Sequence, residues 1–139
     1  MAELMLKEES FAVIGAAMVV YNEMGNGFLE LVYQECMEIE LKERRIPFMA
    51  RGSLALKYKG HALNQKYVPD LICYGQIIVE LKAVNSIVPE HKAQVINYLK
   101  ASGMKLGLLV NFGHHPKVEI ERIVNTRGRY GKDVNRGIG

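Results

Sequence analysis

The sequence predicts a mixed α/β fold in which a central sheet is flanked by helices. Two segments with apolar residues at helical spacing open the chain, and the middle of the chain changes to β-type patterns. A further amphipathic segment then precedes an apolar run that is typical of a strand buried on both faces. The expected order of elements is therefore α-α-β-β-β-α-β.

The first two elements are expected to be helices. Apolar side chains recur at helical spacing through residues 8–23, with Ser10 as a start signal and Gly25 as a stop signal. A second helix is expected from about residue 28 to residue 45. It should end before Pro47, because the residue that precedes a proline disfavours the helical conformation.

The middle of the chain carries patterns typical of strands. Residues 54–58 alternate between apolar residues and small or basic ones. Two β-rich runs follow, at residues 67–72 and 76–82, and only Cys73-Tyr74-Gly75 separates them. This spacing predicts a β-hairpin with a three-residue loop.

The last part of the body should add one helix and one or two strands. Pro89 is expected to open a third helix that ends near Gly103. The run at residues 105–112 is the doubly buried strand, and a short strand or helix at residues 118–124 closes the body.

Length and composition are those of a globular protein. The 139 residues favour one domain, expected over residues 1–125 and followed by a basic tail at 126–139. No apolar run reaches the length of a membrane helix, and the acidic N-terminus does not resemble a secretory signal, so we expect a cytoplasmic protein without a membrane partner. Cys36 and Cys73 lack metal-ligand spacing and are expected to be reduced thiols.

The formal net charge of +3 is carried by the expected tail. Residues 126–139 hold four basic residues and one acidic residue, so the rest of the chain is neutral. The overall charge therefore argues only weakly for a nucleic-acid partner. The tail either contacts phosphates or is a solvated terminus.

The expected hairpin carries the residues with chemical potential. Asp70 lies on its first strand, and Glu80 and Lys82 lie on its second. A three-residue loop gives an even register, which places all three side chains on one face because side chains alternate along a strand. The other face of the second strand is an apolar stripe for the core: Ile77, Val79 and Leu81.

Two neighbouring carboxylates and a lysine suggest a metal-dependent phosphodiesterase. Each carboxylate disfavours ionisation of the other, and a divalent cation removes that conflict. Ligands that offer only oxygen suit Mg²⁺ or Mn²⁺, which can promote attack on a phosphodiester, while Lys82 stabilises charge or orients the water. The alternative is a salt bridge between Lys82 and one of the carboxylates, with no catalysis.

Further candidates lie on the second and third helices. Gln94 and Tyr98 share a face of the third helix, with His91 close by, and they could hold a phosphate, a water or a base. A surface stripe with a half-buried tyrosine explains the same pattern. Glu30 begins the second helix, where the helix dipole favours an acidic residue, or where it could serve as a further metal ligand.

Taken together, these motifs resemble the GxxExxY family, a branch of the PD-(D/E)xK nuclease superfamily. The naming motif corresponds to Gly27, Glu30 and Tyr33. The nuclease motif corresponds to Pro69-Asp70 followed by Glu80-Leu81-Lys82, and a Q-xxx-Y motif to Gln94 and Tyr98. The family's closing strand matches residues 107–113.

The resemblance implies a restriction-endonuclease-like core and a magnesium-dependent nuclease. It implies that Asp70 and Glu80 bind the metal, that Lys82 is catalytic, and that three residues support the site: Glu30, Gln94 and Tyr98. Two positions depart from the pattern. Tyr21 stands where the family has a histidine in the first helix, and Arg51 stands near a position that is commonly acidic.

Three functional hypotheses follow. The first is a nuclease that uses Mg²⁺ or Mn²⁺ and cuts nucleic acid, with DNA expected rather than RNA and with homodimerisation as a possibility for cutting two strands. The second is a catalytically silent nucleic-acid-binding module that keeps the nuclease fold. The third is a structural or regulatory protein in which the charged hairpin forms only an ion pair. The complete set of two acids and a lysine favours the first.

Overall fold

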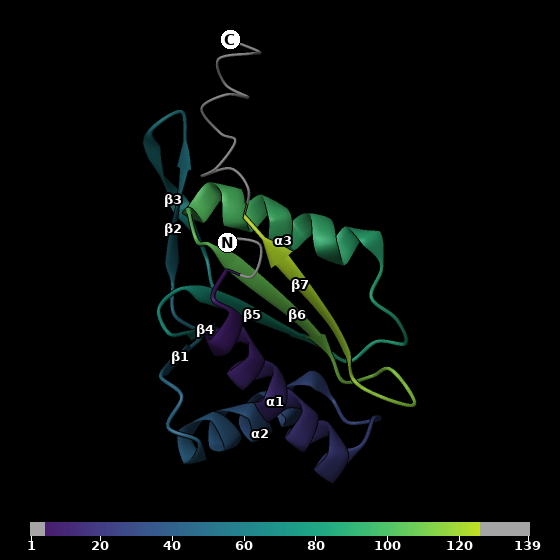
Figure 1. Ribbon diagram of the computed structural model, residues 1–139. Coiled ribbons are helices and arrows are strands. Elements are labelled where there is room, and N and C mark those ends of the chain that lie inside the picture. The colour runs from purple at the N-terminus through teal and green to yellow at the C-terminus, as the bar shows by residue number, and fades with distance from the viewer. Residues whose placement is uncertain (1–4, 126–139) are drawn as a thin grey trace.

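The computed structural model describes residues 5–125 of the chain, so the expected tail at 126–139 lies outside the described residues. Helices α1 (Lys7–Met24) and α2 (Glu30–Glu43) come first, and α3 (Pro89–Ser102) follows the fifth strand. Figure 1 shows α1 and α2 on one side of a central sheet and α3 on the other. The result is a three-layer arrangement.

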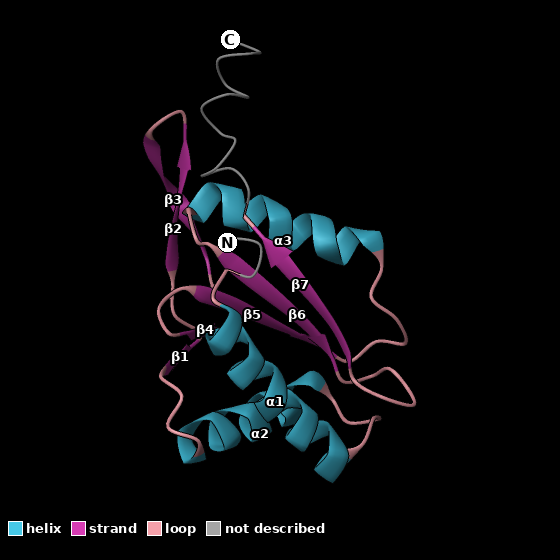
Figure 2. Ribbon diagram, viewed as in Figure 1, coloured by secondary structure: helices cyan, strands magenta, loops and turns pink. Residues whose placement is uncertain are grey.

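The strands form one large sheet and one separate hairpin (Figure 2). The large sheet has the order β1-β4-β5-β6-β7, in which β5 and β6 are parallel and the other neighbours are antiparallel. Its strands are β1 (Phe48–Ala50), β4 (Leu71–Cys73), β5 (Ile77–Lys82), β6 (Leu106–Asn111) and β7 (Glu119–Val124). The separate hairpin pairs β2 (Leu54–Tyr58) with β3 (His61–Tyr67). The expected mixed sheet flanked by helices is confirmed.

The run at residues 67–72 is not the single strand that the sequence predicted. It breaks at Val68-Pro69-Asp70, because Pro69 has no N–H to donate to a ladder, and the chain passes there from one sheet to the other. Two strands, β1 and β3, were not predicted, and residues 118–124 resolve as the strand β7.

The predicted even register of the hairpin is confirmed, although its three-residue loop is Tyr74-Gly75-Gln76 rather than Cys73-Tyr74-Gly75. Strands β4 and β5 pair antiparallel, with Leu71 opposite Val79 and Cys73 opposite Ile77. Continuing that register by one residue places Asp70 beside Glu80. The alternation of side chains along β5 then decides which layer each residue faces.

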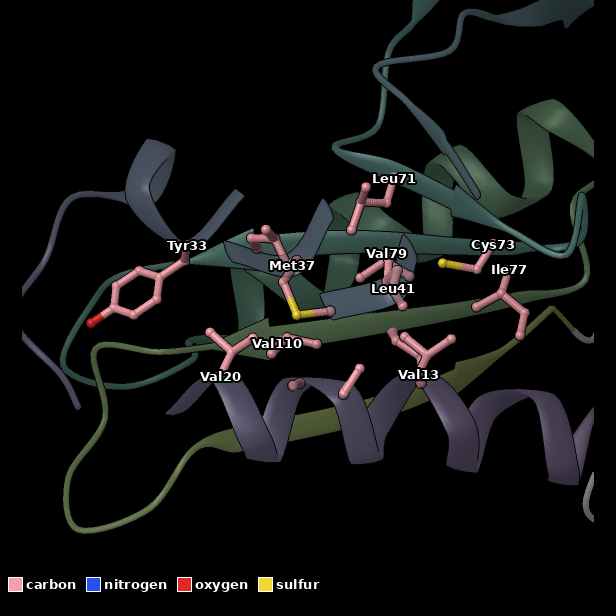
Figure 3. Packing of buried hydrophobic residues seen from close by; sticks show 14 of the residues in the cluster. Val13, Val20, Tyr33, Met37, Leu41, Leu71, Cys73, Ile77, Val79 and Val110 are labelled. Carbon is pink, nitrogen blue, oxygen red and sulfur yellow. The ribbon is translucent and has the colours of Figure 1, made fainter. Parts of the chain in front are cut away.

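The odd-numbered residues of β5 face α1 and α2. Figure 3 shows Ile77 and Val79 packed with side chains of both helices, including Val13 and Met37. These side chains are fully buried, so this layer holds the larger part of the core.

The even-numbered residues of β5 face the layer of α3. Ile78 packs with Val95 and Leu99 of α3 and with Leu56 and Tyr67 of the β2–β3 hairpin. Glu80 and Lys82 continue this face beyond Ile78. The charged end of β5 is therefore open to α3 and to the hairpin rather than to α1 and α2.

Two remaining expectations concern membranes and cysteines. Among residues 5–125, no helix combines the length and hydrophobicity needed to cross a bilayer. Cys36 and Cys73 are free thiols, and burial raises the pKa of Cys73 to about 12, so this thiol stays protonated at neutral pH.

Candidate active site

Asp70 lies where the β4–β5 ladder ends. Its backbone N–H donates a hydrogen bond to Oε1 of Glu80 at 3.1 Å, and its own Oδ2 accepts from the backbone N–H of Leu81 at 2.8 Å. Since β4 begins only at Leu71, the Asp70 carboxylate satisfies a β5 amide that has no strand partner. The two acidic residues are thereby fixed against each other by the backbone.

Helix α2 and the segment after β1 hold the backbone of Asp70 from the other side. The Asp70 carbonyl accepts from the backbone N–H of Arg51 at 3.1 Å and from Nε2 of Gln34 at 3.0 Å. Gln34 is only 5% exposed, and it also donates to Glu38 at 2.8 Å. Gln34 is not among the residues that the sequence predicted for the site, although its position next to Tyr33 on α2 was the available signal.

Glu80 receives its second hydrogen bond from Tyr67. The Tyr67 hydroxyl donates to Oε2 of Glu80, and the Tyr67 ring stacks on the ring of Tyr98 with 3.8 Å between centroids and 7° between planes. Tyr98 thus reaches the acidic pair through Tyr67 rather than directly. Sequence reasoning missed Tyr67 because its partners lie on elements that are distant in the chain.

Burial makes the second negative charge costly at this position. It raises the pKa of Glu80 from 4.5 to about 7, with the hydrogen bond from Tyr67 opposing the shift and the neighbouring Asp70 carboxylate adding to it. Burial and the nearby Glu80 charge raise the pKa of Tyr67 as well, so the tyrosine keeps its proton and remains a donor.

Lys82 shares the α3 face of β5 with Glu80 and is half-buried. The ion pairs among residues 5–125 are Arg44–Glu40 and Lys92–Glu121, so Lys82 pairs with neither carboxylate in this part of the chain. The salt bridge that the sequence left open as an alternative is therefore not formed, and the Lys82 ammonium remains available to an anionic ligand.

Glu30 lies near Asp70 without joining the acidic pair. It is exposed at the start of α2 and lines a small hollow of about 120 Å³ together with Asp70 and Arg51. Within residues 5–125, no three His, Cys, Asp or Glu side chains come together as a set that could hold one metal ion. The oxygen donors brought together are those of Asp70 and Glu80.

Comparison of the sequence with models of known protein families shows to which family the chain belongs. A family model described as the PD-(D/E)XK nuclease superfamily matches residues 7–123. The chain belongs to this superfamily. The matched residues include the acidic pair, Lys82 and all three helices, so the PD-(D/E)XK assignment covers nearly all of the described structure.

Two solved structures are similar to this chain. The crystal structure of SSO0001 superposes with a TM-score of 0.54 and 19% identity, covering 95% of this chain and 66% of that one. An alkaline exonuclease, LHK-Exo from Laribacter hongkongensis, gives a TM-score of 0.46 and 15% identity, covering 91% of this chain and 86% of that one. No curated protein sequence matches significantly. At these identities the first similarity establishes shared architecture, and no activity is taken from it.

In this PD-(D/E)XK chain, the tyrosine of the Gly27–Glu30–Tyr33 motif belongs to the core. Its ring stacks on Phe112 with 4.4 Å between centroids, and its hydroxyl donates to the Gly25 carbonyl and accepts from the Phe28 N–H at 3.2 Å. Tyr33 therefore fixes the turn from which α2 begins, and this turn sets where Glu30 lies.

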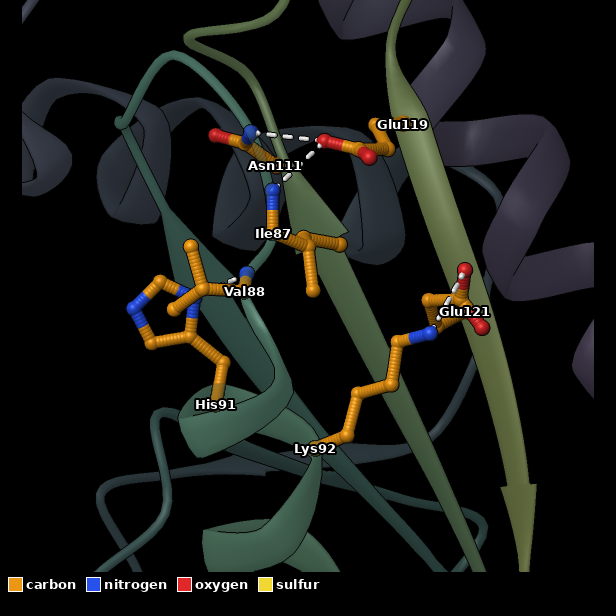
Figure 4. A network of polar contacts seen from close by, with 7 residues as sticks. All are labelled: Ile87, Val88, His91, Lys92, Asn111, Glu119 and Glu121. Atoms are coloured by element: carbon orange, nitrogen blue, oxygen red, sulfur yellow. Dashed lines mark hydrogen bonds and ion pairs between the residues drawn. The ribbon is translucent and has the colours of Figure 1, made fainter.

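Gln94 and His91 occupy different surroundings on α3. Gln94 is exposed and lines a hollow of about 420 Å³ beside Tyr98. His91 accepts a hydrogen bond at Nδ1 from the Val88 N–H at 3.1 Å, which caps the first turn of α3 (Figure 4). Of the helix residues predicted for the site, Tyr98 is the one whose contacts within residues 5–125 lead to the acidic pair, through Tyr67.

A buried polar network holds the segment between Lys82 and α3 (Figure 4). Oδ1 of the buried Asn111 accepts from the Val84 N–H at 3.0 Å, and its Nδ2 donates to Glu119 at 3.0 Å. Glu119 also accepts from the Ile87 N–H at 2.9 Å. These hydrogen bonds therefore fix the segment that connects the end of β5 to the start of α3.

Proposed function

We propose that the chain is a metal-dependent nuclease that hydrolyses phosphodiester bonds, and more narrowly a member of the GxxExxY branch. One observation carries the proposal: the Asp70 N–H donates a hydrogen bond to the Glu80 carboxylate, and Lys82 follows on the same face of β5 with no carboxylate partner among residues 5–125. The role of Tyr33 in positioning Glu30 supports the assignment to the branch.

The acidic pair fits a Mg²⁺ or Mn²⁺ ion. Asp70 and Glu80 offer only oxygen donors, which hard divalent cations prefer. Burial and mutual repulsion raise the pKa of Glu80 to about 7, and a bound cation offsets both costs by compensating the second negative charge. When bound, the cation supplies stabilisation of the negative charge that develops on the attacked phosphate.

The remaining side chains position the acidic pair and the substrate. The Tyr67 hydroxyl orients Glu80, and the stacked Tyr98 holds the Tyr67 ring in place. The Lys82 ammonium lies on the same face, where it stabilises a phosphate oxygen or orients the attacking water through a hydrogen bond. A lysine suits this role because its donors are compact and rotate freely.

Three further roles complete the proposal. Glu30 contributes a carboxylate at the hollow that it shares with Asp70, either as a further metal ligand or through a water. Gln94 contacts a phosphate or a base in the hollow beside Tyr98. His91 supports the site by capping α3. We propose DNA rather than RNA as the substrate, with a homodimer as the form that cuts two strands.

A cleavage panel tests the function. Labelled single- and double-stranded DNA and RNA are incubated with Mg²⁺ or Mn²⁺ and with the wild-type protein, Glu80→Gln or the matched surface control Glu43→Gln. We expect metal-dependent cleavage by wild type and control, and none by Glu80→Gln. A silent binding module would bind nucleic acid without cutting it. Cleavage that Glu80→Gln retains in full would remove the acidic pair from the mechanism.

A further inference from the structure

Residues 1–125 carry no net charge, but their basic and acidic residues are concentrated in different elements. Between residues 44 and 69 the sequence contains no Asp or Glu but six basic residues: Arg44, Arg45, Arg51, Lys57, Lys59 and Lys66. Helices α1 and α2 carry the opposite excess, with eight glutamates and two lysines between them. The β2–β3 hairpin is therefore positively charged although residues 1–125 carry no net charge.

A groove of about 680 Å³ runs between this hairpin and the C-terminal half of α3. Lys57 and Lys59 line it from the hairpin, and Lys100 and Asn97 line it from the helix. All three lysines are exposed, and none pairs with a carboxylate among residues 5–125. Three ammonium groups around one groove favour an anionic ligand with several charges.

The groove adjoins the candidate active site. Asn97 lines both the groove and the neighbouring hollow that Gln94 and Tyr98 form. Tyr98 stacks on Tyr67, whose hydroxyl contacts Glu80. In Figure 1 the hairpin lies beside the C-terminal end of α3. Both belong to the layer that the even-numbered residues of β5, including Glu80, face.

The hairpin also presents an exposed aromatic ring. Tyr58 is 61% exposed at the end of β2, and Nζ of Lys59 lies 5.4 Å from its ring centroid. A cationic groove with an adjacent exposed aromatic ring is the combination by which proteins bind single-stranded nucleic acid, since lysines contact the phosphates and the ring stacks on a base.

We propose that the groove between the β2–β3 hairpin and α3 binds the phosphodiester backbone of a single nucleic-acid strand that extends from the bond being cut. The identity of the ligand rests on the proposed nuclease function. Lys57 and Lys100 contact phosphates from the two walls of the groove, and Tyr58 stacks on a base at the end of the hairpin.

The salt dependence of binding tests the groove. Affinity for a labelled single strand is measured by fluorescence anisotropy over a range of salt concentrations, without divalent metal so that nothing is cut. The variants are Lys57→Gln/Lys100→Gln, the control Lys42→Gln/Lys117→Gln, whose lysines are exposed elsewhere, and Tyr58→Ala. Thermal unfolding midpoints establish that each variant is folded.

Loss of two phosphate contacts should make the slope of log affinity against log salt less negative by roughly 1.4 for a single strand. The control should match wild type, and Tyr58→Ala should weaken binding about tenfold with little change in slope. If wild type binds and cuts nucleic acid but Lys57→Gln/Lys100→Gln leaves the salt slope unchanged, the proposed role of the groove would be overturned and the nuclease proposal would stand. A wild-type protein that neither binds nor cuts nucleic acid would overturn the nuclease proposal as well.

Discussion

The backbone N–H of Asp70 donates to Oε1 of Glu80 at 3.1 Å, across the point where the chain leaves the large sheet. This contact ties the position of one acidic side chain to the backbone of the other, so the pair is built into the fold. Ionising Glu80 at this position costs free energy, because burial and the neighbouring Asp70 carboxylate raise the pKa of Glu80 to about 7. The following predictions concern that pair and the residues that hold it.

The stability of the metal-free protein should depend on pH through Glu80. The folded-state pKa of about 7 exceeds the ordinary value of 4.5, so the folded protein binds the proton more tightly than the unfolded chain. The contribution of Glu80 to the free energy of unfolding is therefore fully present below pH 4.5. It is lost as the pH rises through 7, which lowers the free energy of unfolding by at most about 3 kcal/mol. Urea unfolding between pH 4.5 and 8 measures it.

The matched variant Glu80→Gln carries an amide that mimics the protonated carboxyl and does not titrate. Its unfolding free energy should lack this decline. A wild-type protein whose stability rises steadily over the same range would show that Glu80 ionises normally in the folded state.

Tyr67→Phe should act on Glu80 without removing the ring stack on Tyr98. The lost hydroxyl normally lowers the pKa of Glu80, so the pKa should rise further and the pH–rate profile should move to higher pH. We expect about tenfold slower cleavage at neutral pH. Tyr74→Phe, in the turn between β4 and β5, is the control for the substitution. An unchanged pH profile in Tyr67→Phe would remove this tyrosine from the site.

Lys82→Ala should abolish cleavage and leave the fold intact. The side chain is half-buried and forms no ion pair among residues 5–125, so its removal leaves no buried carboxylate without an ion-pair partner there. Cleavage assays and thermal unfolding together check this, with the exposed Lys105→Ala as control. If Lys82→Ala cut at the wild-type rate, the lysine would have no part in the chemistry.

Gln34→Leu should destabilise the protein by about 1–3 kcal/mol, because the amide then no longer donates to the Asp70 carbonyl and to Glu38. The Asp70 backbone would keep only its bond from the Arg51 N–H on that side. Chemical unfolding compares this variant with Gln65→Leu, which changes an exposed glutamine on β3. Equal stabilities would mean that Gln34 does not hold the Asp70 backbone.

The acidic pair could be placed from the sequence because its geometry is local. A three-residue turn after β4 fixes the register, and alternation along β5 puts Ile77 and Val79 in the core and Glu80 on the other face. The break before Asp70 was also present in the sequence, as Pro69, but its consequence depends on β3 finding β2 as a partner.

The rest of the site depends on tertiary contacts that no local pattern encodes. Tyr67 and Tyr98 meet only when the hairpin packs on α3, and Gln34 reaches Asp70 only when α2 packs on the sheet. The groove likewise joins Lys57 to Lys100 across two elements. Counting charges along the chain gave a neutral body, because the sum does not record where each charge lies.

Metal binding by the acidic pair tests the central claim most directly. Isothermal titration calorimetry with Mn²⁺ at neutral pH should show saturable binding to the wild-type protein and to Glu43→Gln, and none to Asp70→Asn, while the unfolding midpoint of wild type rises with the metal concentration. Equal Mn²⁺ binding by wild type and a folded Asp70→Asn, or no binding by either, would contradict the account.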